Sequence, residues 1–179
     1  MKEPLTLRAD SKNEIYKFID RYFRKLPKNS DGTFNILAEG FDDNDVDALR
    51  HAYVSGIFTK EYGEIAADIF GRLQETFLGG GISSSNSENS TNMDLWNNSV
   101  GRKYGKKFKT KKDLFNNLIK ALKNNELIID PDFDKRKYSG NPEIKGDISN
   151  MVIVLDENKN GKNKVFFDLG KTYHEKVSL

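Results

Sequence analysis

The chain has no cysteine among its 179 residues. Disulfide bonds, thiolate nucleophiles and thiolate zinc sites are therefore excluded. Long apolar runs are missing too, because no stretch approaches the roughly 18 apolar residues of a membrane span. The N-terminal MKEPLTLRAD also has no apolar signal-peptide core. We expect no membrane span and no signal peptide in this chain.

Charge of one sign is also lacking, because 29 basic and 27 acidic side chains leave a net charge of +2. Such a balance does not indicate a nucleic-acid or membrane partner. The P-loop, HExxH and GxSxG patterns and the glycine pattern of dinucleotide-binding proteins are absent as well. The common sequence motifs of nucleotide, zinc-protease and serine-hydrolase sites are thus missing.

Helical periodicity is the main feature that the sequence does contain. With 179 residues, 36% of them hydrophobic, the chain can form one core, so a single domain over 1–179 is expected. Apolar residues recur at helical spacing in five segments, and alternate as in strands near the end of the chain. The sequence predicts a mainly α fold, with about five amphipathic helices followed by a C-terminal β-hairpin at about 148–170.

Capping patterns and turns set the limits of the expected helices. Ser11 with Glu14, and Thr110 with Asp113, form capping-box patterns at the first and last helix. Residues 78–92 are low-complexity Gly, Ser and Asn and predict a loop, either a flap over a site or a disordered connection. The five expected helices cover residues 11–26, 41–58, 60–77, 93–105 and 110–127.

Three charged side chains share a face of the second helix. Asp47, Arg50 and His51 are spaced at i, i+3 and i+4. A carboxylate beside an imidazole can fix its tautomer and raise its basicity, as a catalytic or metal-binding histidine requires. A structural histidine with satisfied hydrogen bonds is the alternative.

The fourth helix carries an unusual polar side, with Asp94, Asn98, Gly101 and Arg102 opposite its apolar side and Asn97 beside them. Asparagine and aspartate compete for backbone hydrogen bonds, so this composition is locally unfavourable in a helix. Local rules are broken at functional or tightly packed sites. We expect either a polar site here, or close packing at the glycine with amide bonds to other helices.

Three further patterns have simpler interpretations. Asp68, Arg72 and Glu75 predict an exposed, salt-bridged helix face. Residues 102–112 carry seven Lys or Arg among eleven, which indicates a solvated helix end or, alternatively, a surface for a phosphate-bearing partner. Residues 156–167 begin like a calcium loop but end in Phe where a bidentate Glu is needed, so a hairpin turn is expected.

The segments DALRHAY and MDLWNNSVGR resemble a bacterial family with patterns close to DAxRHAYW, AHE and MDLxNNxxGR, found in secreted or toxin-like polypeptides. The resemblance covers residues 47 to about 105, inside an expected helical core of about 41–125. It implies a helical domain whose motif helices converge on one polar site. The matching residues are Asp47, Arg50, His51, Glu75, Asp94, Asn97, Asn98 and Arg102.

Two positions depart from the family pattern. Val54 stands where the family has Trp, and Gln74 stands where it has His before Glu75. Without that second histidine a two-histidine metal site is not available. Any metal would be held by His51 with carboxylates alone, which favours a hard or weakly held divalent cation over zinc.

Our main hypothesis is a hydrolase of antibacterial effector or toxin type that acts on a cell-envelope component, such as peptidoglycan or its lipid-linked precursors. His51 acts as general base oriented by Asp47, and Glu75 or Asp94 is the complementary acid or a ligand of a divalent cation. The expected substrate-binding residues are Arg50, Asn97, Asn98 and Arg102.

Such an effector is expected to be secreted, or delivered to the periplasm of a target cell, and to have a cognate immunity protein as partner. Two alternatives remain. One is a non-catalytic helical binding module whose polar residues form a buried network. The other is a phosphodiesterase or nuclease that uses the basic run at 102–112, although the overall charge balance does not favour a nucleic-acid partner.

Overall fold

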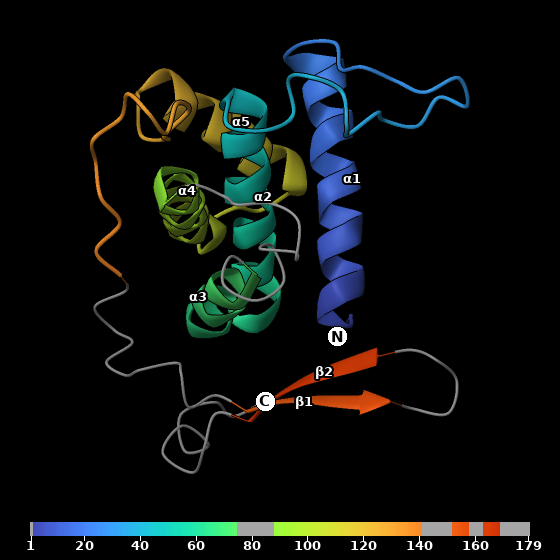
Figure 1. Cartoon of the computed structure of the whole chain (residues 1–179), viewed down its shortest axis with the longest axis vertical. Coiled ribbons are helices and arrows are strands. Elements are labelled where there is room, and N and C mark those ends of the chain that lie inside the picture. Colours follow the sequence, from blue (N-terminus) through green and yellow to red (C-terminus); the bar gives the residue numbers. More distant parts are fainter. Residues whose placement is uncertain (1, 75–87, 141–151, 158–162, 169–179) are drawn as a thin grey trace.

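The structure, a computed structural model, describes residues 2–74 and 88–140 and the backbone of two later strands, and these described residues contain five helices (Figure 1). The prediction of a mainly helical fold with five helices is confirmed. No helix in the described segments is both long and apolar enough to cross a membrane. The helices are α1 (Pro4–Tyr22), α2 (Asp45–Tyr62), α3 (Glu64–Leu73), α4 (Glu88–Gly105) and α5 (Lys111–Lys123).

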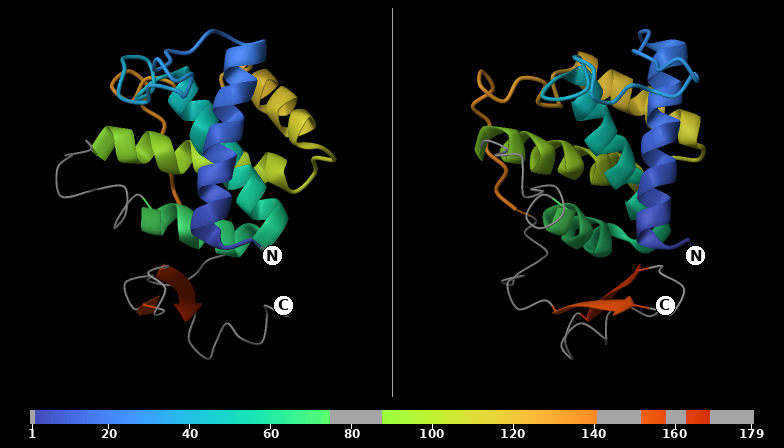
Figure 2. Two further views of the ribbon diagram at one scale, coloured as in Figure 1. Left: turned by 90° about the vertical axis from the view of Figure 1, so that its right-hand side faces the viewer. Right: turned by 45° about the vertical axis from the view of Figure 1, so that its right-hand side comes forward.

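Helix α2 lies at the centre and contacts the other four helices (Figures 1 and 2). Its central position follows from its sequence, which is apolar or small around most of the helix. Val46, Ala48, Leu49 and Phe58 are buried, although they point in different directions around the axis. This arrangement places the polar residues of α2 between α1, α3 and α4.

Helices α2 and α4 cross with their backbones in contact. A Cβ built on Gly101 would overlap the carbonyl oxygen of Ala52 and lie 2.7 Å from its carbonyl carbon. A Cβ on Gly105 would lie 2.6 Å from the carbonyl oxygen of Gly56. Close packing at Gly101, one of the two explanations for the unusual composition of the fourth helix, is therefore present.

The first helix begins earlier than the capping pattern predicts. It starts at Pro4, a residue suited to the first turn because proline has no N–H to leave unpaired, and Ser11 is buried within it. Glu14 instead accepts a hydrogen bond from the hydroxyl of Tyr53 and pairs with Lys111 at 2.9 Å. The predicted capping box at Ser11 is thus wrong.

The other limits differ by a few residues. Helix α2 continues to Tyr62, and Gly63, with φ of 88°, separates it from α3. The expected loop at 78–92 is wrong over 88–92, which belong to α4, and its remaining residues lie outside the described segments. Thr110 and Asp113 form the predicted capping box, with Asp113 N–H donating to the Thr110 hydroxyl at 3.1 Å.

Two strands follow, β1 (Val152–Glu157) and β2 (Asn163–Asp168), and they pair antiparallel with Val152 opposite Asp168. The turn between them and the residues that flank them lie outside the described segments. The hairpin expected at about 148–170, including its calcium-loop-like turn, stays a prediction.

Candidate functional site

His51 lies between two buried carboxylates. Its Nε2 atom is 3.4 Å from Oδ1 of Asp47, one turn earlier on α2, and 3.2 Å from Oδ1 of Asp94 on α4. The carboxylate side chains are 5% and 7% exposed, whereas the imidazole is 13% exposed. The histidine is therefore the member of this group that solvent or a ligand can reach.

Arg50 completes the cluster. Its guanidinium forms an ion pair with Asp47, and its Nη2 atom lies 2.8 Å from Nε2 of His51. Asp47 is fixed further by the backbone N–H of Asp43, which donates to its Oδ2 at 2.9 Å. Asn44 caps α2 by accepting hydrogen bonds from the N–H groups of residues 46 and 47, which stabilises the first turn of the helix, where Asp47 lies.

The surroundings determine the charge of the imidazole. Burial by itself would lower the pKa of His51, and Arg50 acts in the same direction. Asp94 and Asp47 outweigh both effects and raise the pKa of His51 to about 9. In return, His51 and Arg50 outweigh burial and hold the pKa of Asp47 below its usual value.

One contact favours the neutral imidazole instead. A donor–acceptor bond between Arg50 and Nε2 of His51, at 2.8 Å, requires an unprotonated nitrogen. The neighbouring charges favour the protonated form, because the carboxylates of Asp47 and Asp94 both lie beside the imidazole and raise its pKa. At neutral pH the cluster thus holds an imidazolium and a guanidinium against two carboxylates.

The same atoms are close enough to surround a cation. One ligand atom each from Asp47, His51 and Asp94 lie within 4.8 Å of one another. However, Arg50 places a positive charge beside two of these ligands, and a protonated Nε2 has no lone pair to offer. A divalent cation would have to displace both the proton and the guanidinium, so the geometry suits a proton better than a metal ion.

A pocket between α1, α2 and α3 opens beside His51. One side carries cations from two helices, namely Arg8 and Lys12 of α1 and Arg50 of α2. The pocket is therefore charged on the side next to the imidazole.

The opposite side of the pocket is mainly apolar. Val54 and Phe58 of α2 face Phe70 of α3, and the two phenyl rings stack with their centroids 4.4 Å apart. Two buried amides, those of Gln74 and Asn98, also line this space. Gln74 therefore places a neutral side chain at the pocket where the resemblance leads one to expect an imidazole.

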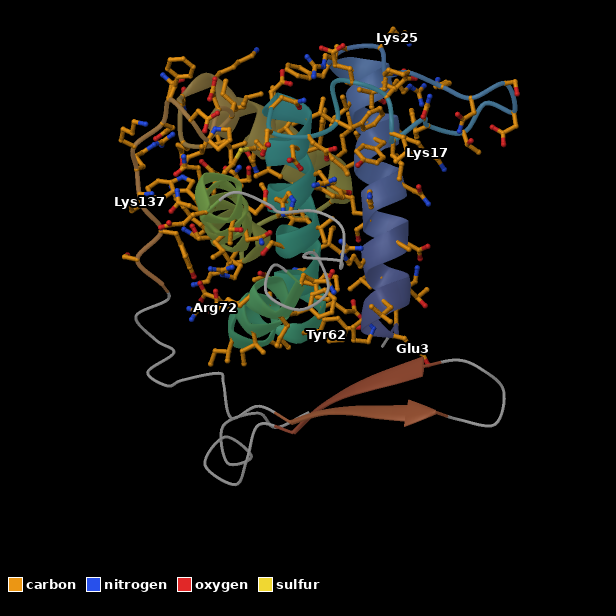
Figure 3. The ribbon with its side chains drawn as sticks, in the orientation of Figure 1. Glu3, Lys17, Lys25, Tyr62, Arg72 and Lys137 are labelled. Atoms are coloured by element: carbon orange, nitrogen blue, oxygen red, sulfur yellow. The ribbon has the colours of Figure 1, made fainter. Side chains whose placement is uncertain are left out.

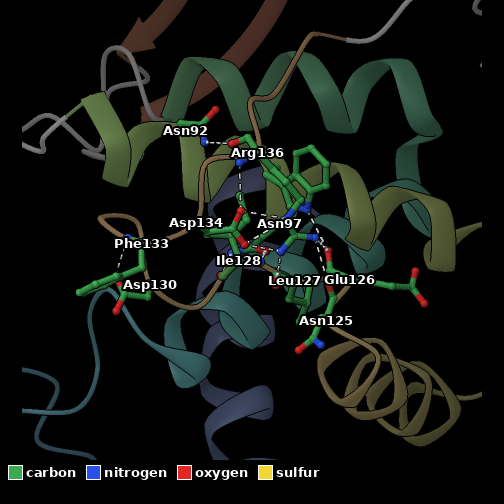
Figure 4. A network of polar contacts seen from close by, with 11 residues as sticks. Asn92, Asn97, Asn125, Glu126, Leu127, Ile128, Asp130, Phe133, Asp134 and Arg136 are labelled. Carbon is green, nitrogen blue, oxygen red and sulfur yellow. Dashed lines mark hydrogen bonds and ion pairs between the residues drawn. The ribbon is translucent and has the colours of Figure 1, made fainter.

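Asn97, predicted to bind substrate, is fully buried, and its amide bonds to the backbone of the segment after α5. Its side-chain N–H donates to the carbonyl of Ile128 at 2.8 Å, and the Ile128 N–H donates to its Oδ1 at 2.9 Å (Figure 4). Arg136 binds the same segment, because its guanidinium donates a hydrogen bond to the carbonyl of Leu127 at 2.9 Å. The amide thus fixes the chain that follows α5.

Arg102, another predicted substrate residue, belongs to a second buried network. It pairs with Asp68 at 2.7 Å, and Arg72 pairs with the same carboxylate at 2.9 Å (Figure 3 labels Arg72). The hydroxyl of Tyr138 donates to Asp68 at 2.9 Å. The predicted ion pair between Asp68 and Arg72 is thus present, but Asp68 is 1% exposed, so the prediction that this face is exposed is wrong. Glu75, the third residue of that pattern, lies outside the described residues.

Most of the basic run at 102–112 is neutralised within the protein. Beyond the pair formed by Arg102, Lys103 pairs with Glu126, Lys106 with Glu64 and Lys111 with Glu14. Four of its seven cations therefore have carboxylate partners, which weakens the argument for a phosphate-binding surface there.

The structure thus brings together five of the eight predicted site residues. Asp47, Arg50, His51 and Asp94 form one cluster, and Asn98 lines the adjoining pocket. Sequence reasoning missed the two cations of α1 that line the same pocket. Their i, i+4 spacing was the available signal, but the first helix was expected to start at residue 11, after one of them.

Residues 24–126 match a family described as a domain of unknown function, DUF6973. The matched segment contains the whole His51 cluster and begins after α1. No curated protein and no solved structure matches the chain.

Proposed function

We propose that the protein is a hydrolase with His51 as its proton donor. The chain belongs to the DUF6973 family, whose function is unknown, so membership of the family assigns no activity. A single observation carries this proposal. An imidazole is held between two buried carboxylates at the wall of a pocket, and of these three groups only the imidazole lines that pocket. Strongly shifted titratable groups in clefts are typical of functional sites.

The raised pKa assigns His51 the role of an acid. The main hypothesis from the sequence gave it the role of base, but an imidazole with a pKa of about 9 is protonated at neutral pH. Water adds to the electrophilic atom of the substrate, and the bond to the leaving oxygen breaks. That oxygen takes the proton of His51, and the proton released by the attacking water restores the imidazolium.

The remaining residues divide into two groups. Asp47 and Asp94 are positioning residues, because they charge and orient His51 without reaching the pocket. Arg50 and Asn98 line the pocket and are proposed to bind substrate. Glu75 remains a proposed participant, and any divalent cation would have to bind in place of the Arg50 contact.

We further propose, on the resemblance to secreted and toxin-like proteins alone, that the hydrolase is an antibacterial effector. Its substrate would then be a cell-envelope component in the periplasm of a target cell, and a cognate immunity protein would cover the pocket. This part of the proposal can fail while the assignment of His51 stands.

The test is growth of a bacterium that expresses the chain in the cytosol or in the periplasm. We expect inhibition from the periplasm, loss of inhibition in His51→Gln, and retention in His174→Gln, which removes the other histidine. Hydrolysis of envelope extracts should follow the same pattern. Thermal unfolding of the purified variants checks that they remain folded. Inhibition and hydrolysis unaffected by His51→Gln would refute the proposal.

A non-catalytic binding module is the second candidate, and one observation favours it. Two of the motif residues, Asn97 and Arg102, are used to hold the fold rather than the pocket. This candidate predicts that a captured partner binds His51→Gln as tightly as the parent chain and that no envelope extract is hydrolysed.

A further inference from the structure

Ser55 carries a buried hydroxyl at the pocket beside His51. It lies one turn after His51 on α2, is 5% exposed and lines the same pocket. Among the described residues its Oγ atom has no hydrogen-bond partner, whereas the hydroxyl of Thr59, one turn later, donates to the carbonyl of Ser55 at 2.9 Å. A buried polar atom without a partner is costly, and ordered water is the usual partner where protein atoms supply none.

The pocket has the size of a water site. Its cavity volume, the space open to the centres of water molecules, is about 40 Å³. One water needs roughly 10–15 Å³, so a few waters fit there but a larger organic group does not. The amides of Gln74 and Asn98 and the amine of Lys12 line this space together with the Ser55 hydroxyl. These polar groups can supply the several hydrogen bonds that a buried water requires.

Lys12 of α1 has the properties of a base. Among the described residues it takes part in no ion pair. The titratable or charged groups around it or in the same pocket are Arg8 and Tyr16 of α1, Asp42 before α2, and Asp47, Arg50 and His51 of α2. Burial is the largest cause that lowers the pKa of Lys12, the charges of the two arginines act in the same direction, and the two carboxylates oppose this shift without reversing it. Lys12 therefore loses its proton at a lower pH than an exposed lysine does.

We infer that this pocket holds the water that attacks the substrate, with Ser55 as the positioning residue that binds the water and Lys12 as the base that takes its proton. The inference rests on the proposed function, because it supplies the nucleophile of the hydrolysis in which His51 is the proton donor. The water oxygen forms a bond to the electrophilic atom of the substrate, and one water proton passes to the Nζ atom of Lys12. The bond to the leaving oxygen breaks, and that oxygen takes the proton of His51. Exchange of protons with solvent then restores the neutral amine and the imidazolium.

Two measurements test the site without turnover. A high-resolution crystal structure should show an ordered water about 2.5–3.0 Å from Oγ of Ser55, and Ser55→Ala should lose this water. NMR titration of the lysine side chains, with Lys12→Met and Lys17→Met identifying the two resonances, should give Lys12 a lower pKa than Lys17, an exposed residue of the same helix (Figure 3). A Ser55 hydroxyl that donates to the carbonyl of His51 with no water beside it would overturn the inference. So would a Lys12 that titrates at or above the pH at which Lys17 does.

Hydrolysis of envelope extracts tests the two roles in catalysis. Lys12→Met, which keeps the apolar stem and removes the amine, should lower the maximal rate about a hundredfold or more, as loss of a general base does. Ser55→Ala should lower the maximal rate about tenfold and leave unchanged the amount of extract that gives half of this rate, because the hydroxyl binds the water and not the substrate. Lys17→Met and Thr59→Val are the matched controls and should keep the parental rate. The first removes an exposed charge of α1, and the second removes a hydroxyl that is already bonded within α2.

The two roles also predict how the rate depends on pH. The active form has a neutral Lys12 and a protonated His51. The rate should therefore rise with pH as Lys12 loses its proton, and fall above about pH 9, where His51 loses its own. Lys12→Met should remove the rise, and Lys17→Met should retain it.

Failure of this inference can be told apart from failure of the proposed function. Hydrolysis that depends on His51 but is unaffected by Lys12→Met and Ser55→Ala, in variants whose thermal unfolding matches the parent, would keep the hydrolase and overturn the water site. No hydrolysis of any extract by the parent chain would remove the hydrolase and, with it, the role of Lys12 as a base.

Discussion

Replacing Asp94 by Asn should make His51 a much stronger acid. In the parent protein the rise of its pKa from 6.5 to about 9 corresponds to about 3 kcal/mol of preference for the charged imidazole. The charge of Asp94, whose Oδ1 lies 3.2 Å from Nε2 of His51, is the largest single cause that raises this pKa. A charge-assisted hydrogen bond of this kind contributes about 1.5–3 kcal/mol. The pKa of His51 should therefore fall by about 1 to 2 in Asp94→Asn, while Asp47 remains in place.

Proton NMR of the imidazole C2 resonances measures this directly, because the chain has only two histidines. His174→Gln leaves a single resonance and assigns it to His51. A parent pKa of His51 at or below 6.5 would refute the reasoning, since the imidazole would then be neutral and would accept a hydrogen bond from Arg50. An unchanged pKa in Asp94→Asn would show that the 3.2 Å contact carries no charge interaction.

The same shift predicts how stability depends on pH. Because folding raises the pKa of His51, its stabilising contribution is complete below about pH 6.5 and is lost as the pH rises through about 9. Asp47, whose pKa is lowered, contributes in the opposite direction, and its contribution is lost in acid. Denaturant unfolding should show a loss of stability between about pH 7 and 10 that His51→Gln removes.

Three further predictions concern stability and are measured by denaturant unfolding. Asp68→Asn should destabilise the protein by about 3–5 kcal/mol, because the guanidinium of Arg102 is left buried without its carboxylate. Asn97→Leu should cost about 2–4 kcal/mol, because both backbone groups of Ile128 lose their partner. Gly101→Ala should cost about 1–3 kcal/mol or more despite its better helix propensity, because its Cβ overlaps a carbonyl group of α2.

Each of these has an outcome that would contradict it. Asp68→Asn within about 1 kcal/mol of the parent would mean that solvent reaches Arg102. A near-neutral Asn97→Leu would mean that water replaces the amide. Gly71→Ala is the control for Gly101→Ala, because its Cβ would meet only the flexible side chain of Asn98 at 3.3 Å. Equal effects of the two alanine substitutions would refute the close crossing.

The polar cluster could be anticipated in part because it is local. Asp47, Arg50 and His51 share one helix, so their spacing alone places them together. The approach of Asp94 depends on how α4 crosses α2, which no periodicity specifies, and only the resemblance implied it. The number of helices was also predictable, because amphipathic spacing and the Thr110 capping box are local signals in the sequence.

The structural roles of other polar residues could not be read from the sequence. The partners of Asn97 and Arg102 include Ile128 and Tyr138, which lie in irregular chain after α5. Such segments carry no periodic pattern, so nothing in the sequence shows which helix they contact. A buried hydrogen-bonding residue and a substrate-binding residue therefore have the same appearance in the sequence.

The glycine crossing of α2 and α4 sets the proton affinity of the site through the backbone. Because no side chain separates Gly101 from Ala52, the distance between the two helices cannot be adjusted by a change of rotamer. His51 precedes Ala52 on α2 and Asp94 lies on α4, so the crossing fixes the backbones that carry the two side chains of the 3.2 Å contact. A ligand or partner that moves α4 along α2 would therefore change the acidity of His51.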